Sequence, residues 1–310
     1  MSSVTISAIR ELRERTQAGM ADCKSALIEA EGDLDKAVEV ILKKGKAKSA
    51  KRAGRVAAEG EVRAEVFDGG RAAAVAEVNI ETDFSARNEN FKAFVDKVMA
   101  VAKTVDLGTD LLTCETAGKT LADHGTELTA RVGEKVSIRR FDRLAIPEGK
   151  HGFCHSYVHM GGKIGVILTI EAETAEAASH EGVKSFADDT AMQVAAMDPT
   201  ALRRDQLDEA IVAKQREIFE AQLREDPKPK PEKVWPKIIE GKVSKWFSEV
   251  VLLEQQSAQH KKAIDELRKE AGEAAGAPIA ITGFVRFQLG EGIEKKQDDV
   301  RAGVAELLNK

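Results

Sequence analysis

The stretch Glu77-Val-Asn-Ile-Glu-Thr-Asp-Phe-Ser-Ala-Arg-Asn88 joins a predicted strand to a predicted helix. β-Branched residues in an apolar run predict the strand, and an amphipathic pattern over residues 90–105 predicts the helix. At the junction, Thr82-Asp83-Phe84 places a large aromatic ring beside a carboxylate. Either Phe84 is buried and Asp83 caps the helix, or both side chains project outward as a wedge against another molecule. Local physics alone favours the buried ring.

The pattern around this junction recurs 92 residues later in the chain. Residues 69–82 align without a gap on residues 161–174, and each copy has a strand before a Gly-Gly turn and a helix after a Glu-Thr pair. The repeat predicts two structurally similar α+β halves. The second copy continues Thr-Ala-Glu-Ala where the first continues Thr-Asp-Phe-Ser. Asp83 and Phe84 are therefore not needed to form the shared fold, which favours the outward wedge.

Composition indicates a water-soluble, helix-rich protein rather than a nucleic-acid polycation. The 310 residues carry a net charge of −5, with 32% charged and 5% aromatic residues, and the length allows two or three compact units. Three cysteines without a framework spacing, Cys23, Cys114 and Cys154, indicate reduced thiols. No apolar run approaches the ~20 residues that span a bilayer, and no secretory signal is visible. We therefore expect a cytoplasmic protein.

The predicted fold class is α+β, with antiparallel sheets. A helical stretch is expected at residues 109–124 between the two hairpins, further helices at residues 175–196, 205–225 and 232–253 after the second hairpin, and further strands at residues 135–144 and 280–289. The predicted domains are a three-helix bundle at 1–45 whose third helix ends at Gly45, a basic linker at 46–58, a first α+β half at 59–146, a second half at 147–296 with a helical hairpin at about 205–253, and a C-terminal helical module at 297–310.

Three local features have two interpretations each. Met20 follows the turn residue Gly19 and is either a core side chain or an exposed apolar contact. Residues 43–55 carry seven basic residues and no acidic one, which suits either phosphate contacts or a solvated linker or helix. The three histidines and Cys154 of residues 151–159 could bind zinc, but strand alternation places the cysteine on the face opposite the histidines and disfavours a metal site.

No motif of enzyme chemistry is present in the sequence. Gly118-Lys-Thr120 has the tail of a phosphate-binding loop, but Thr113 stands where its first glycine would be. Neither an H-E-x-x-H zinc motif nor a G-x-S-x-G elbow occurs. We expect neither enzymatic activity nor a cofactor.

Several segments together resemble the elongation factor Ts family, the bacterial guanine-nucleotide exchange factors for elongation factor Tu. Ser85 stands where the family usually has Val, and the family pattern is lost over residues 256–277. The matching segments are residues 11–24 (E-L-R-E-R-T-Q-A-G-M-A-D-C-K), 77–88, 156–166 (S-Y-V-H-M-G-G-K-I-G-V), 238–247 and 281–295 (I-T-G-F-V-R-F-Q-L-G-E-G-I-E-K).

The resemblance implies a function and a set of contact residues. The N-terminal bundle would be ubiquitin-associated-like and would dock on the nucleotide-binding domain of elongation factor Tu, as would the C-terminal helix. The partner would be bound in its GDP-loaded and nucleotide-free forms, with its Mg²⁺ displaced. The implied contacts are Leu12, Arg13 and Met20 in the bundle, His159, Gly161 and Gly162 at the second hairpin, and Thr82, Asp83, Phe84 and Ser85 at the Mg²⁺ site.

Other function classes remain as alternatives. The basic segment 43–55 sustains an RNA- or ribosome-associated module, although we expect no direct nucleic-acid partner. The histidines and cysteine of residues 151–159 sustain a metal-dependent enzyme. We expect no membrane association, and the helical hairpin is a candidate element for forming a homodimer.

Overall fold

A computed structural model describes residues 4–16, 18–226 and 230–294 of the chain. It is a mixture of helices and antiparallel sheets, which confirms the α+β class. The chain forms two compact units, the first made of Met1–Arg63, Ala76–Phe141 and Gln288–Lys310 and the second of Ala64–Val75 and Asp142–Phe287. The predicted C-terminal helix at residues 297–308 lies outside the described residues.

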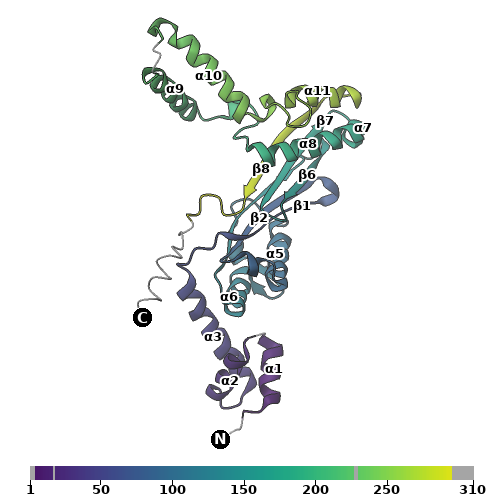
Figure 1. The fold of residues 1–310 in the computed structure, drawn as a ribbon. Coiled ribbons are helices and arrows are strands. Elements are labelled where there is room, and N and C mark those ends of the chain that lie inside the picture. The colour runs from purple at the N-terminus through teal and green to yellow at the C-terminus, as the bar shows by residue number, and fades with distance from the viewer. Residues whose placement is uncertain (1–3, 17, 227–229, 295–310) are drawn as a thin grey trace. The chain divides into compact units, whose positions relative to one another are not determined.

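A three-helix bundle opens the first unit (Figure 1). Its helices are α1 (Ile6–Thr16), α2 (Met20–Glu29) and α3 (Leu34–Arg52). The Asp33 side chain accepts hydrogen bonds from the amides of Asp35 and Lys36, each at 3.0 Å, and so caps α3 as its position before the helix predicts. The buried core of the bundle consists of Ile9, Leu12, Cys23, Ala26, Leu27, Ala30 and Ala37.

The prediction that the third helix ends at Gly45 is wrong, because α3 continues to Arg52. Gly45 is buried where α3 packs against α6 (Leu121–Val132). A Cβ at Gly45 would lie 3.3 Å from the Cβ of Ala130, closer than ordinary packing. The glycine is therefore explained by a close helix–helix approach, and the segment predicted as a linker begins as the last turns of a helix.

The first sheet has the strand order β1-β2-β5. Its strands are β1 (Glu59–Phe67), β2 (Ala72–Ile80) and β5 (Val136–Ala145), and every residue of β2 is buried. A one-turn helix α4 (Asp83–Ala86) and then α5 (Glu89–Ala102) follow β2, which confirms the predicted strand-to-helix junction. α5 buries one apolar face, including Phe91, Phe94 and Val98, and packs beside α6.

The helix predicted at residues 109–124 is wrong over most of its length. Residues of this stretch form a short turn η2 (Leu111–Thr113) and a small hairpin of β3 (Glu115–Thr116) and β4 (Lys119–Thr120). Ala117 and Gly118 between the strands have φ values of 50° and 76°, which a right-handed helix cannot contain. α6 begins only after Thr120, whose hydroxyl accepts a hydrogen bond from the Asp123 amide at 3.1 Å.

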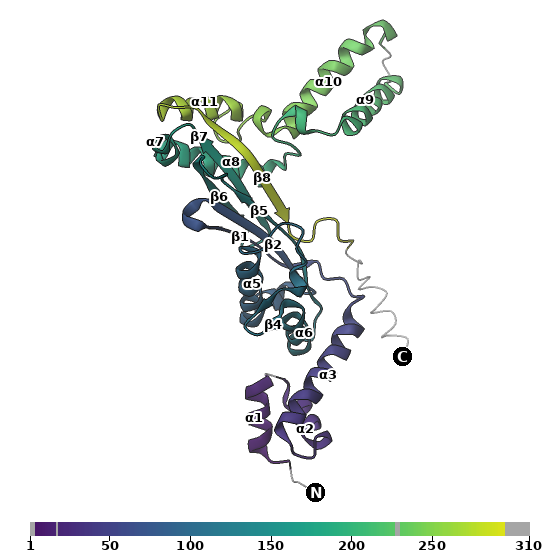
Figure 2. The same ribbon diagram turned by 180° about the vertical axis from the view of Figure 1, so that it is seen from behind.

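The second sheet has the order β6-β7-β8. β6 (His151–His159) pairs antiparallel with β7 (Ile164–Ala172), and β8 (Ile279–Gln288) completes the sheet. α8 (Glu181–Met197) packs on β6 and β7, and α11 (Ile264–Ala274) packs on α8. Figure 2 shows this sheet from behind, with β8 in the foreground. The buried core includes Leu168, Ile170, Val183, Phe186, Leu252, Ile264 and Ile281.

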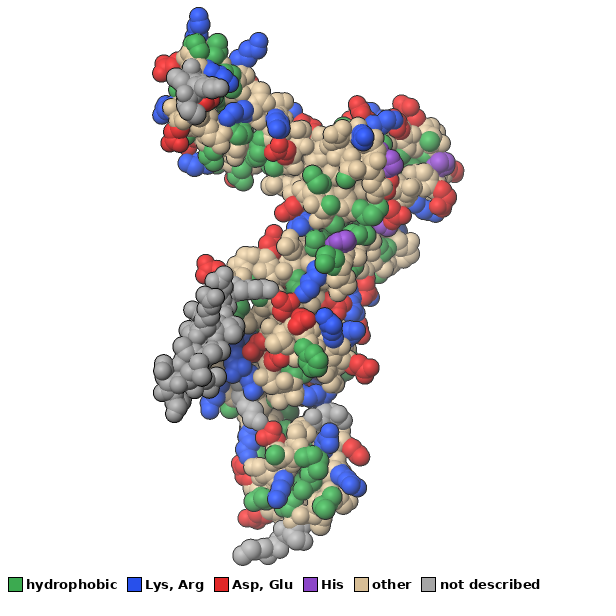
Figure 3. All heavy atoms as spheres, in the orientation of Figure 1, with side chains coloured by type: hydrophobic (Ala, Val, Ile, Leu, Met, Phe, Trp, Pro, Cys, Tyr) green, Lys and Arg blue, Asp and Glu red, His purple; other side chains and the backbone are tan. Residues whose placement is uncertain are grey.

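Two further helices, α9 (Glu209–Arg224) and α10 (Trp235–Val250), pack on each other and confirm the predicted helical hairpin. An ion pair between Arg216 and Glu240 joins them. Basic and acidic side chains are interspersed over the surface of this hairpin (Figure 3). The remaining short turns are η1 (Asp68–Gly70), η3 (Arg204–Gln206), η4 (Glu232–Val234) and η5 (Leu252–Glu254).

The predicted repeat is present in the backbone of the two hairpins. Asp68, Gly69 and Gly70 have φ values of 53°, 60° and 92°, and the equivalent residues 160–162 have 49°, 63° and 97°. Gly60 and Gly152 are also equivalent, because a Cβ at either would collide with a carbonyl of the neighbouring strand. The two hairpins thus share turn conformation and close-approach glycine at the offset that the sequence predicts.

The helices that follow the hairpins repeat as well. Thr82 caps α4 through a bond from the Ser85 amide, and Thr174 caps α7 (Ala175–Ser179) through a bond from the Ala177 amide, both at 3.2 Å. The single helix predicted at residues 175–196 is wrong, because His180 ends α7 and caps α8. In the first half, Arg87 ends α4 and the next residue, Asn88, caps α5.

Candidate functional site

Phe84 projects into solvent from the one-turn helix α4. Its side chain has an exposed fraction of 84%, so the buried ring that local physics favours is wrong. Asp83 does not cap a helix either, because Thr82 caps α4 and Asn88 caps α5. The Asp83 carboxylate instead pairs with Arg87 at 3.2 Å on the surface, an exposed contact that contributes little stability. Phenyl ring and carboxylate are both presented outward.

The turn that carries Phe84 is bonded to a single carboxylate, that of Glu134. Its Oε1 accepts from the Thr82 hydroxyl at 2.8 Å and from the Ser85 hydroxyl at 2.6 Å, and its Oε2 accepts from the Thr82 amide at 3.0 Å. Hydrogen bonds to a charged acceptor are stronger than neutral ones. Both hydroxyls in the Thr82–Ser85 turn are therefore tied to the segment between α6 and β5.

A second hydrogen bond joins these two segments, with the carboxylate now on the strand side and the amide on the segment between α6 and β5. The Glu81 carboxylate accepts a hydrogen bond from the Lys135 amide at 2.6 Å. Arg55 also approaches Glu81, at 3.3 Å. Residues 81–82 and 134–135 thus exchange side-chain-to-backbone bonds, which fixes the base of the turn on both sides.

The bundle residues implied by the family resemblance fall into two groups. Leu12 is completely buried in the bundle core, and its side chain supports the fold of α1 and α2 from inside. Arg13 is exposed, and Met20 has an exposed fraction of 43% at the start of α2. Apolar and charged side chains are mixed on the bundle surface in the lower part of Figure 3. The surface contacts available in this group are Arg13 and Met20.

The hairpin residues lie at the tip between β6 and β7. His159 is exposed, and its Nδ1 shares a hydrogen bond with the Tyr157 hydroxyl at 2.8 Å while the two rings stack. Gly161 is exposed and Gly162 is buried in the turn. Met160 precedes them with an exposed fraction of 73%. The sequence interpretation missed Met160, although the Gly-Gly turn that follows it marks a hairpin tip, and connecting segments run over the surface.

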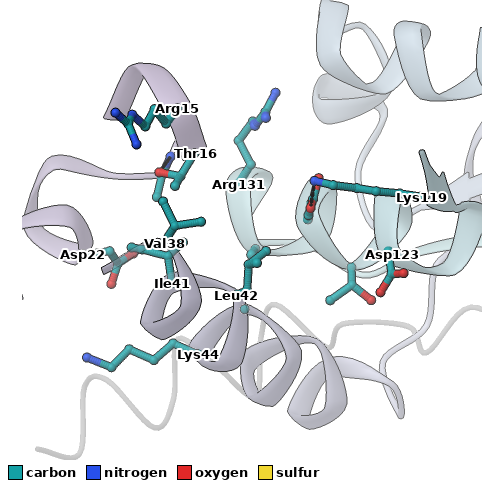
Figure 4. A pocket seen from close by; sticks show the side chains of 15 residues that line it. Arg15, Thr16, Asp22, Val38, Ile41, Leu42, Lys44, Lys119, Asp123 and Arg131 are labelled. Atoms are coloured by element: carbon teal, nitrogen blue, oxygen red, sulfur yellow. Dashed lines mark hydrogen bonds and ion pairs between the residues drawn. The ribbon is translucent and has the colours of Figure 1, made fainter. Parts of the chain in front are cut away.

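A cavity of about 380 Å³ lies within the first unit, between α3 and α6 (Figure 4). Val38, Ile41 and Leu42 of α3 contribute apolar side chains, and Figure 4 shows charged side chains such as Arg15 and Lys119 around it. None of the residues implied by the resemblance is among those that line this cavity. The candidate contact residues therefore belong to the outer surface and not to this cavity.

Two of the three histidines of β6, His155 and His159, contact different partners. His155 Nε2 lies 2.7 Å from Asp188 of α8, and burial lowers the pKa of His155. The Cys154 thiol points to the other side of the strand and donates to the Arg71 carbonyl at 3.3 Å. Within residues 4–16, 18–226 and 230–294, no group of three or more His, Cys, Asp or Glu side chains is placed to hold a metal ion.

Part of the basic segment 43–55 is engaged inside the molecule. Lys44 pairs with Glu29 at 2.6 Å, and Arg55 pairs with Glu81 at 3.3 Å. These contacts leave fewer free cations for phosphates than the sequence alone indicates. Among the described residues, no helix has the length and apolar character that crossing a membrane requires.

Comparisons with known proteins identify the family. The model of the family described as elongation factor TS matches residues 81–291. The chain belongs to the elongation factor Ts family. Elongation factor Ts of one strain of Clostridium perfringens is 42% identical over 311 residues, which cover 99% of this chain and 100% of the relative. Elongation factor Ts of Clostridium kluyveri is 41% identical and that of a Nitratiruptor species is 41% identical, with 96% and 98% of both chains covered. Membership of the elongation factor Ts family assigns the chain a role in translation elongation.

Sequence reasoning missed Glu134, whose carboxylate accepts three hydrogen bonds from the Thr82–Ser85 turn. It is 49 to 52 residues away from the side chains it binds, and no local pattern joins such distant positions. The structure shows that Ala277 stands two residues before β8 where Glu134 stands two residues before β5, a difference that depends on the observed strand bounds and that the predicted strands at 135–144 and 280–289 do not reveal.

Proposed function

We propose that the chain is a guanine-nucleotide exchange factor that binds elongation factor Tu carrying GDP and promotes release of that GDP. It makes and breaks no covalent bond, and it acts in the cytoplasm. The observation that carries the proposal is the outward-facing phenyl ring of Phe84 on a turn whose base is fixed by hydrogen bonds.

The exposed ring costs stability that the fold does not recover. Burying a Phe side chain contributes about 1.5–3 kcal/mol relative to leaving it in water, and Phe84 forgoes most of this. At the equivalent position of the second half stands Glu176, which is also exposed. The shared backbone therefore places this side chain outside in both halves, and only the first half puts a large apolar group there. Such a residue is explained by a partner that receives it.

The mechanism follows from the demands of the nucleotide site in the partner. GDP is held by phosphate-loop donors and by Mg²⁺, which requires near-ideal octahedral geometry. Insertion of Phe84 between partner helices, with Asp83 beside it, would displace groups that hold the metal, and GDP affinity would fall. Linkage requires that GDP weakens the grip of the factor on its partner by the same ratio. The factor is therefore released when nucleotide rebinds.

Docking surfaces other than the wedge would supply the binding free energy. Arg13 and Met20 of the bundle would contact the nucleotide-binding domain, and His159 with Gly161 would contact a second part of elongation factor Tu. Leu12 and Gly162 would act indirectly, since both are buried and maintain the surfaces that carry their neighbours.

Timed release of fluorescent GDP from elongation factor Tu tests the proposal. Addition of the chain should accelerate release in buffer with millimolar Mg²⁺, and the acceleration should shrink when EDTA removes the metal, because the step that the factor promotes has then already occurred. An unchanged release rate in Mg²⁺ buffer would rule out the exchange activity. Equal acceleration with and without Mg²⁺ would rule out the metal-displacement mechanism.

A further inference from the structure

We propose that Glu134 and Ser85 are positioning residues that fix the direction in which Phe84 points, and that they are dispensable for folding. The inference rests on the proposed exchange function, since a fixed direction matters only if the ring enters a partner. Its basis is the set of three hydrogen bonds from the Thr82–Ser85 turn to one carboxylate.

The bonds restrain the part of the turn that carries the ring. Thr82 precedes Asp83 and Ser85 follows Phe84, and both hydroxyls donate to the same oxygen of Glu134. Besides these contacts, the one-turn helix has the Thr82 cap, the backbone bonds of a single turn and the exposed ion pair between Asp83 and Arg87, and a helix of this length is not stable alone. The carboxylate therefore supplies much of the order that the turn possesses.

The second half shows what the fold needs without a wedge. Thr174 still caps α7, but Ala177 replaces Ser85, and Ala277 and Pro278 stand before β8 where Glu134 and Lys135 stand before β5. Ala177 is buried and has no hydroxyl to donate, Ala277 has no carboxylate, and Pro278 has no amide hydrogen. The half that lacks Phe84 thus lacks both of the exchanged bonds, although its strand, cap and helix are formed.

The hydrogen bonds from the Thr82–Ser85 turn to Glu134 have a direct kinetic consequence. A turn released from Glu134 samples other directions, so a smaller fraction of bound complexes has the ring placed to enter the partner. Binding of the partner through the other docking surfaces remains. Loss of a bond to a charged group that is partly solvated lowers the competent fraction by about fivefold to tenfold, and the effect falls on the maximal rate of GDP release rather than on the half-saturating concentration of the factor.

The experiment compares Glu134→Ala, Ser85→Ala and the conservative Glu134→Gln in the full chain. We expect Glu134→Ala to lower the maximal rate of stimulated GDP release about fivefold to tenfold, with an unchanged half-saturating concentration and a cooperative unfolding transition whose melting temperature falls by about 2–5 °C. Ser85→Ala removes one hydrogen bond and should lower the maximal rate of stimulated GDP release about twofold to threefold. Glu134→Gln keeps an acceptor oxygen and should give a higher maximal rate than Glu134→Ala. Hydrogen exchange at the amides of residues 83–88 should be faster in Glu134→Ala.

The double variant Phe84→Ala/Glu134→Ala separates positioning from a role of its own. If Glu134 acts through the ring, the double variant releases GDP at the rate of Phe84→Ala alone. The inference would be overturned if Glu134→Ala lowered the rate of GDP release in the Phe84→Ala background by the same factor as in the wild type. A wild-type maximal rate for Glu134→Ala alone would also overturn it. If instead the wild-type chain fails to accelerate GDP release at all, the proposed function itself is refuted, and this outcome is distinct from the other two.

Discussion

The buried carboxylate of Glu77 allows the most quantitative prediction about the first unit. Glu77 lies on β2 with no exposed surface. Its carboxylate accepts from the Arg139 guanidinium at 2.9 Å, from Arg140 Nε at 2.7 Å, from the Asn79 side chain at 3.1 Å and from the Gly290 amide at 2.8 Å. The substitutions to make are Glu77→Ala and Glu77→Gln.

The magnitude follows from what each substitution leaves behind. Removing one member of a buried ion pair costs about 3–5 kcal/mol. The arginine side chains retain exposures of 27% and 31% and can turn toward water, so we expect about 3 kcal/mol for Glu77→Ala, at the low end of that range. Glu77→Gln keeps an acceptor but loses the charge, and we expect about 2 kcal/mol, because bonds to charged groups contribute about 1 kcal/mol more than neutral ones.

The pH dependence has a definite sign. Burial alone raises the pKa of Glu77, but the hydrogen bonds from Gly290, Arg139, Asn79 and Arg140 more than offset this and hold the pKa below its ordinary value. A carboxyl group whose pKa is lower in the folded state contributes stability above its unfolded pKa of about 4.3, and the contribution is lost as pH falls through the folded value. The stability difference between the wild type and Glu77→Gln should therefore shrink below about pH 4.

Urea unfolding followed by circular dichroism at pH 7 and at decreasing pH provides the assay. Glu115→Gln is the matched control, because Glu115 is exposed on the short strand β3, and it should leave the unfolding free energy within about 0.5 kcal/mol of the wild type. An unaltered unfolding free energy for Glu77→Ala would refute the reasoning. A Glu77→Gln deficit that stays constant down to pH 3 would refute the assigned direction of the pKa.

Three further predictions concern thiols and glycines. In native protein, thiol reagents at pH 8 should modify Cys114 well before Cys154, because burial raises the pKa of the Cys154 thiol to about 11; equal modification rates would contradict this. Gly152→Ala should lower the unfolding free energy by about 1–3 kcal/mol, because the new Cβ would collide with the strand β7 backbone, and an unchanged denaturation midpoint would show that the backbone gives way. Gly241→Ala should raise the unfolding free energy by about 0.5–1 kcal/mol, because nothing lies within 4 Å of the added Cβ in the exposed middle of α10. A lower unfolding free energy for this variant would mean that Gly241 has a packing role.

Local chemistry made much of the fold predictable from the sequence. Asp33 at a helix start and the Gly-Gly turns of the two hairpins are specified by short-range capping and by conformations that glycine adopts readily. The repeat of residues 69–82 at 161–174 was visible because the equivalent hairpins share their turn glycines. These features depend on neighbours a few residues away, which a single sequence contains.

The errors arose where distant contacts decide the structure. A glycine at position 45 is typical of a helix end, but here it allows α6 to pack closely against α3, and the sequence does not show where α6 lies. Ala117 adopts a left-handed backbone conformation, which alanine rarely does and which its residue type therefore does not predict. Phe84 is apolar and adjacent to a core strand, so local physics favours burial, whereas the comparison with the second half favours the outward side chain that the structure shows. The Glu134 contacts join positions about 50 residues apart.

The release of fluorescent GDP from elongation factor Tu in the presence of the Phe84→Ala variant tests the central claim most directly. The matched control is Leu107→Ala, which removes another exposed apolar side chain of the first unit. Our account predicts that Phe84→Ala melts like the wild type, still binds its partner, and slows stimulated release at least tenfold, since about 1.4 kcal/mol of lost differential binding already gives that factor, while Leu107→Ala retains the wild-type rate. Release at the wild-type rate from the Phe84→Ala complex would contradict the claim that this ring opens the nucleotide site.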